Sequence, residues 1–215
     1  MPPTHPTRGA SLVEFVLVFP VAVLLVLGLV QCGLLGWGKL SLNHLTFMAA
    51  RHGALHHADE EAITAAVVRG LVPFHQDSRQ RNDALRVLEA HARAQHAARA
   101  YLQVERVSPN ERTFEDFGVE RQGRQEIPHD NLRWRQTTVG ARSGVHIQDA
   151  NLLKIKVTYG QELKVPLMGA LWRTVLCSGG AAPSLSSDCA RYYAFNRVPL
   201  VSFAVVEMQS PARAP

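Results

Sequence analysis

Short catalytic signatures are missing from this sequence of 215 residues. It contains no phosphate loop ending in Lys-Ser or Lys-Thr, no Gly-x-Ser-x-Gly elbow, no His-Glu-x-x-His and no Cys-x-x-Cys pair. An acidic cluster could supply a general acid and base, but nothing in the sequence fixes its geometry, and a solvated loop is the better interpretation. Its members are Glu105, Glu111, Glu115, Asp116 and Glu120. We therefore expect neither an enzyme nor a cofactor.

Aromatic residues are scarce, at 7% of the sequence, and the chain is only mildly basic. Its 23 Lys and Arg residues exceed its 18 Asp and Glu residues, which gives a formal charge of +5. The basic residues are mostly Arg, scattered from Arg51 to Arg213. A nucleic-acid-binding face would gather them in one place with stacking aromatics, so nucleic acid is not an expected partner.

Cysteine occurs only three times. Cys32 lies in a long apolar run, where a free thiol behaves as a small hydrophobic side chain. Cys177 and Cys189 lie close together in a Gly/Ser/Pro-rich stretch, and a disulfide between them would persist only in an oxidising compartment. Two reduced, unpaired thiols are the alternative. A bridge would therefore indicate that the C-terminal part of the chain lies outside the cytoplasm.

Charged residues are absent from Phe15 to Gly38, a run of 24 positions. A helix of this length covers about 36 Å, enough to cross a bilayer core of roughly 30 Å with some tilt. The apolar core of a secretory signal peptide is shorter and ends in small residues at a cleavage site. We therefore interpret this run as a membrane-spanning helix. Glu14 stands at its entrance, where an unpaired charge is costly.

Positive charges on the two sides of the span are nearly balanced, because Arg8 and the N-terminal amine precede it, and Lys39 and Arg51 follow it. The positive-inside rule is therefore not decisive. The cysteine pair decides for a cytoplasmic N-terminus and an external C-terminal domain. Within the span, Pro20 removes one backbone hydrogen bond, and Gly28 offers a small surface to another helix, although ordinary glycine usage in membrane helices also explains it.

Beyond the span, the sequence indicates an α+β domain of helices and a small antiparallel sheet. Helical spacing of apolar residues continues the first helix from Leu40 to Ala58 as an amphipathic stalk. We expect a short helix capped by Asp59 and stopped at Gly70, and a longer helix from Asn82 to Gln103. This longer helix should direct a set of apolar side chains toward one side. The set is Leu85, Leu88, Ala92 and Leu102.

The second half of the chain carries the strand signals. Leu152 to Tyr159 alternates apolar and polar residues, and we expect it to turn near Gly160 and return through Leu163 to Pro166. Val198 to Met208 is a second predicted strand, and Leu167 to Leu176 is apolar enough for a short helix packed on the sheet or on the membrane surface.

Two segments of the sequence look irregular, and one group of histidines invites a metal hypothesis. Arg121 to Gly144 is predicted to form exposed strands and loops with Trp134 as an anchor, and Ser210 to Pro215 a loose tail. His52 and His56 would share a helix face, with further histidines at 44 and 57. Because no cysteine lies nearby, we favour a solvated polar face over a metal site.

The start of the chain resembles the processing site of type IV prepilins. Gly9 is followed by Ala10-Ser11-Leu12-Val13-Glu14, so that a Glu stands five positions after a Gly and before a long apolar helix. Phe15 directly after Glu14 is typical of the Flp-pilus branch, and Leu-Val-Glu-Phe with a later Pro resembles TadE-like pseudopilins of the tight-adherence (Tad) system. An ordinary signal anchor with an interfacial Glu is the alternative. Ala10 departs from the Phe that commonly comes first in mature type IV pilins.

The resemblance implies that a prepilin peptidase cuts between Gly9 and Ala10. The processing residues would be Gly9, Ala10, Glu14 and Phe15. Glu14 would then neutralise the new amine of Ala10, in its own chain or in a neighbouring one, because leaving either charge alone in a low-dielectric setting is expensive. Helix assembly would involve Glu14, Pro20 and Gly28.

The resemblance also implies a minor pilin or pseudopilin that acts in assembly or presentation of a Tad/Flp-type pilus. It would be a single-pass protein of the bacterial inner membrane, with a leader (1–9), a transmembrane helix and stalk (10–58) and a pilin-like extracytoplasmic domain (59–215). Its partners would be the inner membrane, the prepilin peptidase, other pilins and the Tad assembly platform. The loop between Cys177 and Cys189 resembles the disulfide-bounded loop of many pilins. An unprocessed, signal-anchored envelope protein that binds a partner or ligand is the alternative.

Overall fold

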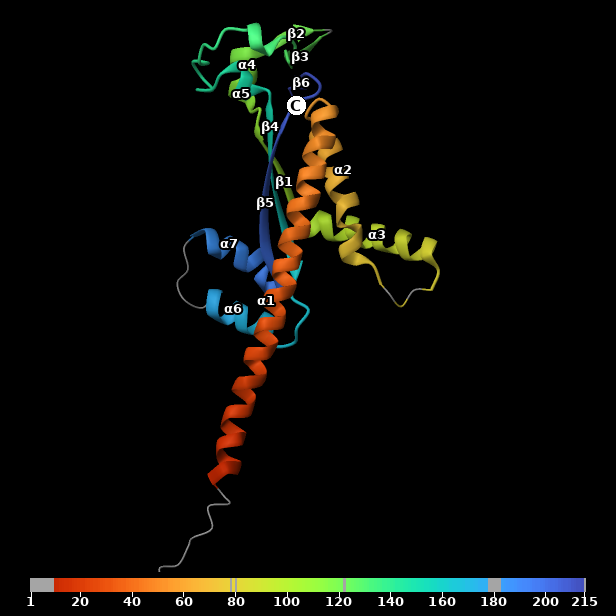
Figure 1. Ribbon diagram of the computed structural model, residues 1–215, viewed down its shortest axis with the longest axis vertical. Helices are drawn as coiled ribbons and strands as arrows, with labels where there is room; N and C mark the ends of the chain where they lie inside the picture. The colour runs from red at the N-terminus through yellow and green to blue at the C-terminus, as the bar shows by residue number, and fades with distance from the viewer. Residues whose placement is uncertain (1–9, 78, 80, 122, 178–182, 215) are drawn as a thin grey trace, which may run out of the picture. The chain divides into compact units, whose positions relative to one another are not determined.

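The computed structural model describes residues 10–77, 79, 81–121, 123–177 and 183–214. The chain divides into two compact units, and each combines segments that are distant in the sequence. We call Met1–Gly38 with Gln161–Val198 the N-terminal unit, and Lys39–Gly160 with Pro199–Pro215 the core unit. One helix, α1 (Ala10–Leu55), begins in the N-terminal unit and ends in the core unit (Figure 1). The predicted α+β class, with a long apolar helix first, is confirmed.

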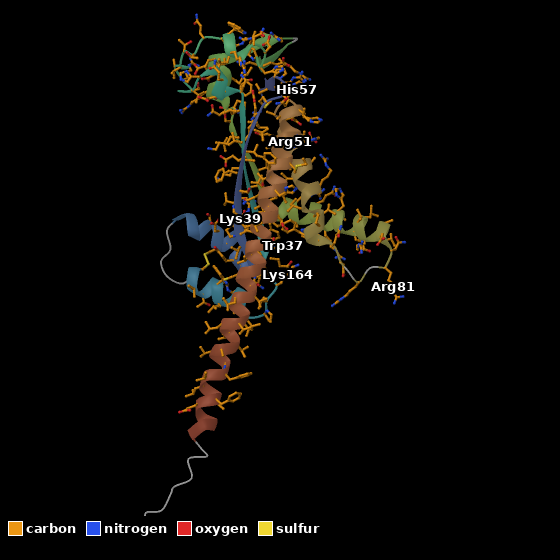
Figure 2. All side chains as sticks on the ribbon, in the orientation of Figure 1. Trp37, Lys39, Arg51, His57, Arg81 and Lys164 are labelled. Atoms are coloured by element: carbon orange, nitrogen blue, oxygen red, sulfur yellow. A yellow bond between two sulfur atoms is a disulfide. The ribbon has the colours of Figure 1, made fainter. Side chains whose placement is uncertain are left out.

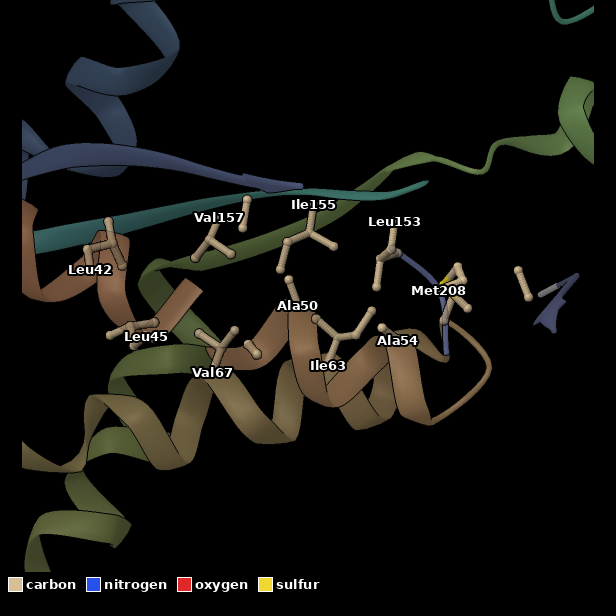
Figure 3. Packing of buried hydrophobic residues seen from close by; sticks show 14 of the residues in the cluster. Leu42, Leu45, Ala50, Ala54, Ile63, Val67, Leu153, Ile155, Val157 and Met208 are labelled. Carbon is tan, nitrogen blue, oxygen red and sulfur yellow. The ribbon is translucent and has the colours of Figure 1, made fainter. Parts of the chain in front are cut away.

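The core unit packs the second half of α1 and helix α2 (Glu60–Leu71) against a strand, β4 (Leu152–Glu162). The buried positions of α1 recur every three or four residues, as expected for one helix face. They are Leu42, Leu45, Ala49, Ala50 and Ala54. Figure 3 shows Leu42, Leu45, Ala50 and Ala54 of α1 facing the inner residues of β4 and α2. The meeting residues are Ile63, Val67, Leu153, Ile155 and Val157.

Two glycines let α1 and α2 approach closely. A Cβ atom on Gly53 would lie 2.5 Å from Ile63 Cγ1, and one on Gly70 would lie 2.8 Å from Leu45 Cβ. Both distances are shorter than any ordinary carbon contact. As predicted, the Asp59 side chain caps α2 by accepting the Ala62 N–H at 2.9 Å. The helix ends at Leu71, so Gly70 is explained by this close packing rather than by a need to stop the helix.

β4 is the central strand of a three-stranded sheet in the order β1-β4-β5. Its neighbours are β1 (Leu102–Ser108), which pairs with it antiparallel, and β5 (Arg197–Glu207). The predicted alternation is confirmed, but the predicted turn near Gly160 is wrong, because β4 continues to Glu162. Leu163 to Pro166 forms no strand, since β1 and β5 already occupy both edges of β4.

Helix α3 (Asp83–Tyr101) begins as predicted, with the Asn82 side chain accepting the Ala84 and Leu85 N–H groups. Its buried face is made of alanines, at positions 90, 94, 97 and 98. The predicted leucine face is wrong, because Leu85 and Leu88 are 48% and 67% exposed. Ala92 is also exposed. Small side chains are the ones that allow a helix to lie close to its neighbours. The helix ends at Tyr101, two residues before the predicted end at Gln103, because β1 begins at Leu102.

A second sheet has the order β2-β3-β6, and its middle strand lies in the segment that was predicted to form exposed strands and loops. Its strands are Val119–Arg121, Arg124–Ile127 and Ala212–Arg213, all antiparallel. Short helices surround it: α4 (Glu111–Phe117), α5 (Ile147–Ala150) and the 3-10 turn η3 (Leu132–Trp134). A further 3-10 turn, η2 (Val72–His75), follows α2. Trp134 is 89% exposed, so it is not the predicted anchor.

The C-terminal segment is not a loose tail, contrary to the prediction. The Gln209 N–H and the Ser210 hydroxyl both donate to the Ala54 carbonyl, at 3.1 Å and 2.9 Å. The Arg213 N–H donates to the His57 carbonyl at 2.9 Å, and Arg213 also pairs with β3. These bonds satisfy carbonyl groups at the end of α1 that a helix leaves without internal partners. The prediction of a loose tail depended only on the residues within this segment, whereas its hydrogen-bond partners lie about 150 residues earlier in the chain.

Glu126 and Arg213 hold this segment in a pH-dependent way. Arg213 Nε donates to Glu126 Oε1 at 2.7 Å, and this bond lowers the pKa of the Glu126 carboxyl from its usual value. A carboxyl group with a lowered pKa stabilises the folded chain at pH values above its pKa in the unfolded chain, which is about 4.3. This stabilisation is lost as the pH falls through the pKa of the group in the folded chain. We expect Glu126→Gln to lower the thermal midpoint at pH 7, with a gap from the unmodified chain that closes on acidification below about pH 4. A gap that is equal at pH 7 and pH 3 would contradict this.

The N-terminal unit contains α6 (Met168–Cys177), α7 (Pro183–Arg191) and the 3-10 turn η4 (Tyr193–Phe195). α6 confirms the predicted short helix. α7 was not predicted, since the stretch between the cysteines reads as a loop. Glu162 and Arg197 face each other at 4.0 Å, and the Leu163 N–H donates to the Asn196 carbonyl at 2.9 Å. These contacts join the end of β4 to the start of β5.

Candidate assembly helix

The first half of α1 presents apolar side chains on every side. From Glu14 to Val30 all residues are exposed except Leu27 and Gly28, which are half-buried. Phe15, Leu17, Leu25 and Leu29 are each more than 60% exposed. Figure 2 shows side chains projecting from both sides of this part of α1. A surface of this kind in water would be very unfavourable, so it requires an apolar environment.

Among the described residues, α1 is the helix that is long and apolar enough to cross a membrane. Its most apolar 18 residues have a mean hydropathy of 2.7, and only 6% of this stretch is buried inside the protein. The low burial distinguishes α1 from the core helix of a soluble protein, which can be equally long and apolar. These properties are consistent with a single-pass membrane protein.

Glu14 is the one charged residue between Ala10 and Gly38. Its side chain is exposed, and no described cation forms an ion pair with it. The next residue, Phe15, stacks on Phe19 with ring centroids 5.0 Å apart. The carboxylate therefore lies at the start of a bare apolar helix and is available to a partner from outside the described residues.

The predicted processing residues stand at the start of this helix. Gly9 lies outside the described residues, and Ala10 is the first residue of α1. Pro20 lies inside α1 without ending it. A Cβ atom on Gly28 would meet nothing within 4 Å, and the same holds for Gly33 and Gly36. Packing within the described chain therefore does not explain these glycines, and the predicted role of Gly28 in helix assembly stays a prediction.

Gln31 marks the point where the chain begins to cover α1. Its side chain is buried, and its Oε1 accepts the Val165 N–H at 3.0 Å. We call Leu163–Leu167, the segment between β4 and α6, the strap. Sequence reasoning missed this contact, although Gln31 is the one amide side chain in the apolar run from Phe15 to Gly38. That isolated amide was the available signal.

The predicted disulfide is confirmed. Cys177 and Cys189 are bridged, with Cα atoms 5.9 Å apart and a sequence separation of 12. The bond joins the last residue of α6 to α7, so it closes the helical pair of the N-terminal unit. Cys32 on α1 is a free, exposed cysteine.

The histidines at the end of α1 and directly after it make separate contacts. His57 Nδ1 lies 2.9 Å from the Pro211 carbonyl oxygen, while His52 Nε2 lies 3.3 Å from Arg69 Nη2. His52 and His56 stack on each other with ring centroids 4.0 Å apart. In the described part of the chain, no three His, Cys, Asp or Glu side chains are arranged to hold a metal ion.

The acidic residues predicted to lie in a solvated loop are exposed except for half-buried Asp116, but they lie on β1, α4 and β2 rather than in one loop. Asp116 accepts the Arg142 and Ser143 N–H groups and the Ser143 hydroxyl, and these bonds lower the pKa of its carboxyl. Glu105 pairs with Lys156 at 3.2 Å, and Glu115 with Arg142 at 3.0 Å. These carboxylates hold loops and strands in place rather than converge on a shared cavity.

Comparison with known proteins identifies the same helix. Residues 9–51 match the family model described as TadE-like protein. The match begins at Gly9 and includes Glu14 and most of α1, so the resemblance of this segment is confirmed. No curated protein and no solved structure matches the chain significantly.

Proposed function

We propose that this chain, with its TadE-like N-terminal segment, is a minor pilin or pseudopilin that acts in assembly or presentation of a Tad/Flp-type pilus. The observation that carries the proposal is the combination in one segment of the matched Gly9-to-Glu14 motif and a bare apolar helix. Such a helix can pass from lipid to a bundle of like helices without exposing its surface to water.

Processing would free the helix for this role. A prepilin peptidase of the inner membrane would cut between Gly9 and Ala10, which removes Arg8 and leaves an amine at Ala10. Glu14 of the same or a neighbouring chain would neutralise this amine. Gly28 and Pro20 would shape the surface on which neighbouring helices meet. The chain's function is then association with other pilins and with the assembly platform rather than catalysis.

The disulfide supports the proposed orientation. A bond between Cys177 and Cys189 persists in an oxidising compartment and is rare in the cytoplasm. With one span, an external C-terminal part puts the N-terminus in the cytoplasm. The leader, residues 1–9, would then lie on the cytoplasmic side of the inner membrane.

Intact mass spectrometry of the full chain co-expressed with a prepilin peptidase tests the proposal. We expect the mass of a chain that begins at Ala10. The matched control is Gly9→Val, which places a branched side chain at the cleaved bond and should leave the chain uncut. A chain that still begins at Met1 in the presence of an active peptidase would contradict the proposal and favour an unprocessed, signal-anchored envelope protein.

A further inference from the structure

α6 carries an apolar face that no described part of the chain covers. Leu171 and Val175 are 51% and 68% exposed, and Leu167, directly before the helix, is 67% exposed. Residues spaced by four lie on one side of a helix. Another side of α6 is packed inward, since Met168 is buried and Trp172 is half-buried. The uncovered face therefore belongs to a helix that is already fixed in the N-terminal unit.

The backbone conformation at Leu167 is also unfavourable for a leucine. Its φ is +69°, in the left-handed region that glycine adopts freely and that side chains with a Cβ rarely adopt. A leucine at this position thus has an unfavourable backbone and an unfavourable contact with water. An apolar environment around its side chain would remove the second of these costs.

The strap fixes where this face lies along α1. Val165 is hydrogen-bonded to Gln31, and α6 begins three residues later, at Met168. From Glu14 to Val30, α1 is exposed except at half-buried Leu27 and Gly28. The apolar face of α6 therefore starts next to the point where the strap begins to cover one side of α1, within the same unit.

The length of the bare helix locates the edge of a membrane at this point. Glu14 to Val30 comprises 17 residues, or about 26 Å of helix, which is the shortest length usual for a helix that crosses a bilayer. A span that continued to Gly38 would draw the strap and its exposed Lys164 into the hydrocarbon, where a charge is costly. The outer boundary therefore falls near Gln31, at the level of the strap.

The charges around α6 suit a lipid surface. Leu163 to Cys177 contains Lys164 and Arg173 and no acidic residue. Both basic side chains are exposed, and Figure 2 labels Lys164 beside α1. Arg173 follows Leu171 by two positions, which puts it on the other side of the helix. A helix with apolar residues on one face and basic residues on its opposite, polar face is the usual form of an interfacial helix on anionic lipid.

We propose that α6 lies in the outer headgroup layer of the membrane that α1 crosses. Leu167, Leu171 and Val175 enter the acyl chains, and Lys164 and Arg173 contact anionic phosphates. The chain is thus attached to the membrane at two points, one crossing it and one lying on it. The inference rests on α1 as a membrane span and does not depend on leader cleavage or filament assembly.

Spin-label accessibility tests the inference on the full chain. The protein carries Cys32→Ala and Leu171→Cys, with a nitroxide on the new thiol, in vesicles of phosphatidylethanolamine and phosphatidylglycerol. Non-reducing electrophoresis first checks that Cys177 and Cys189 are bridged. We expect the ratio of oxygen accessibility to nickel-complex accessibility to be several-fold higher than for a matched label at Arg173→Cys. Equal ratios at the two positions would overturn the proposal, and so would a label at 171 shielded from both reagents, which indicates a protein contact.

A second comparison tests the role of the basic residues. Adding Lys164→Gln and Arg173→Gln to the chain labelled at 171 should lower the ratio in vesicles that contain phosphatidylglycerol, and should have little effect in phosphatidylcholine. An equal effect in both lipids would overturn the assignment to anionic phosphates. Flotation of the same vesicles tests whether α1 spans the membrane. Chains that do not float with the vesicles would show that neither α1 nor α6 is bound to the membrane. A chain that floats but is not cut after Gly9 contradicts the proposed function and leaves this inference intact.

Discussion

Replacement of Glu14 by alanine is expected to leave cleavage after Gly9 intact and to reduce incorporation of the chain into a filament about 100-fold. Without the carboxylate, the amine of Ala10 stays unpaired among apolar helices, and a charge in that setting costs about 3 kcal/mol. This energy corresponds to about two factors of ten in an equilibrium. The measurement is the amount of processed chain in sheared filaments, by immunoblot, against the amount in the membrane.

Two further variants separate this role of Glu14 from a general loss of fold or charge. Glu14→Gln keeps the size of the side chain and should fail as Glu14→Ala does, because the charge is what matters. Glu61→Ala removes an exposed carboxylate of α2 and should assemble normally. Filaments that contain Glu14→Ala at the normal level would remove the role given to Glu14 and leave the processing proposal standing.

Replacement of Gly53 by valine is expected to destabilise the core unit by about 2–3 kcal/mol. A Cβ atom at this position would lie 2.5 Å and 2.8 Å from Ile63 Cγ1 and Cδ1, and 3.1 Å from Leu153 Cδ2. These atoms belong to α2 and β4, which pack against Gly53 from different directions. A shift of α1 away from one of them would therefore bring it closer to the other. The extra methyl groups of valine increase the overlap.

The matched control for this prediction is Gly36→Val, in the same helix. A Cβ atom on Gly36 meets nothing within 4 Å, so the core unit should keep its stability. Amide exchange at Ile155 and Val157 in β4 measures the opening of the core unit without the helical signal of the apolar half of α1. Equal protection in the Gly53 and Gly36 variants would contradict the close crossing of α1 and α2.

Local signals in the sequence predicted local structure well. The Asp59 and Asn82 caps, the alternation of Leu153 to Tyr159 and the apolar continuity of α1 each depend on neighbours within a few residues. Long-range pairing left no comparable signal. β1 was missed because its partner is β4, about 50 residues later, and the hairpin expected at Gly160 was wrong for the same reason.

Burial by small side chains also escaped prediction. The hydrophobic pattern of α3 favoured its leucines, whereas the packed face consists of alanines, because closeness of approach decided the packing. For the candidate site, the apolar length of α1 was readable from the sequence. The strap was not readable, since a single amide at Gln31 does not reveal which later residue binds it.

The hydrogen bonds between the end of α1 and Gln209 to Arg213 have a consequence for the order in which the protein is made. The ribosome synthesises α1 well before these residues, so the end of α1 stays without these hydrogen-bond partners until about 150 further residues have been made. The apolar half of α1 can enter a membrane during this interval, while the rest of the chain is still open. Insertion can therefore precede folding of the core unit, and deleting Gln209 to Arg213 would leave the end of the first helix without these partners.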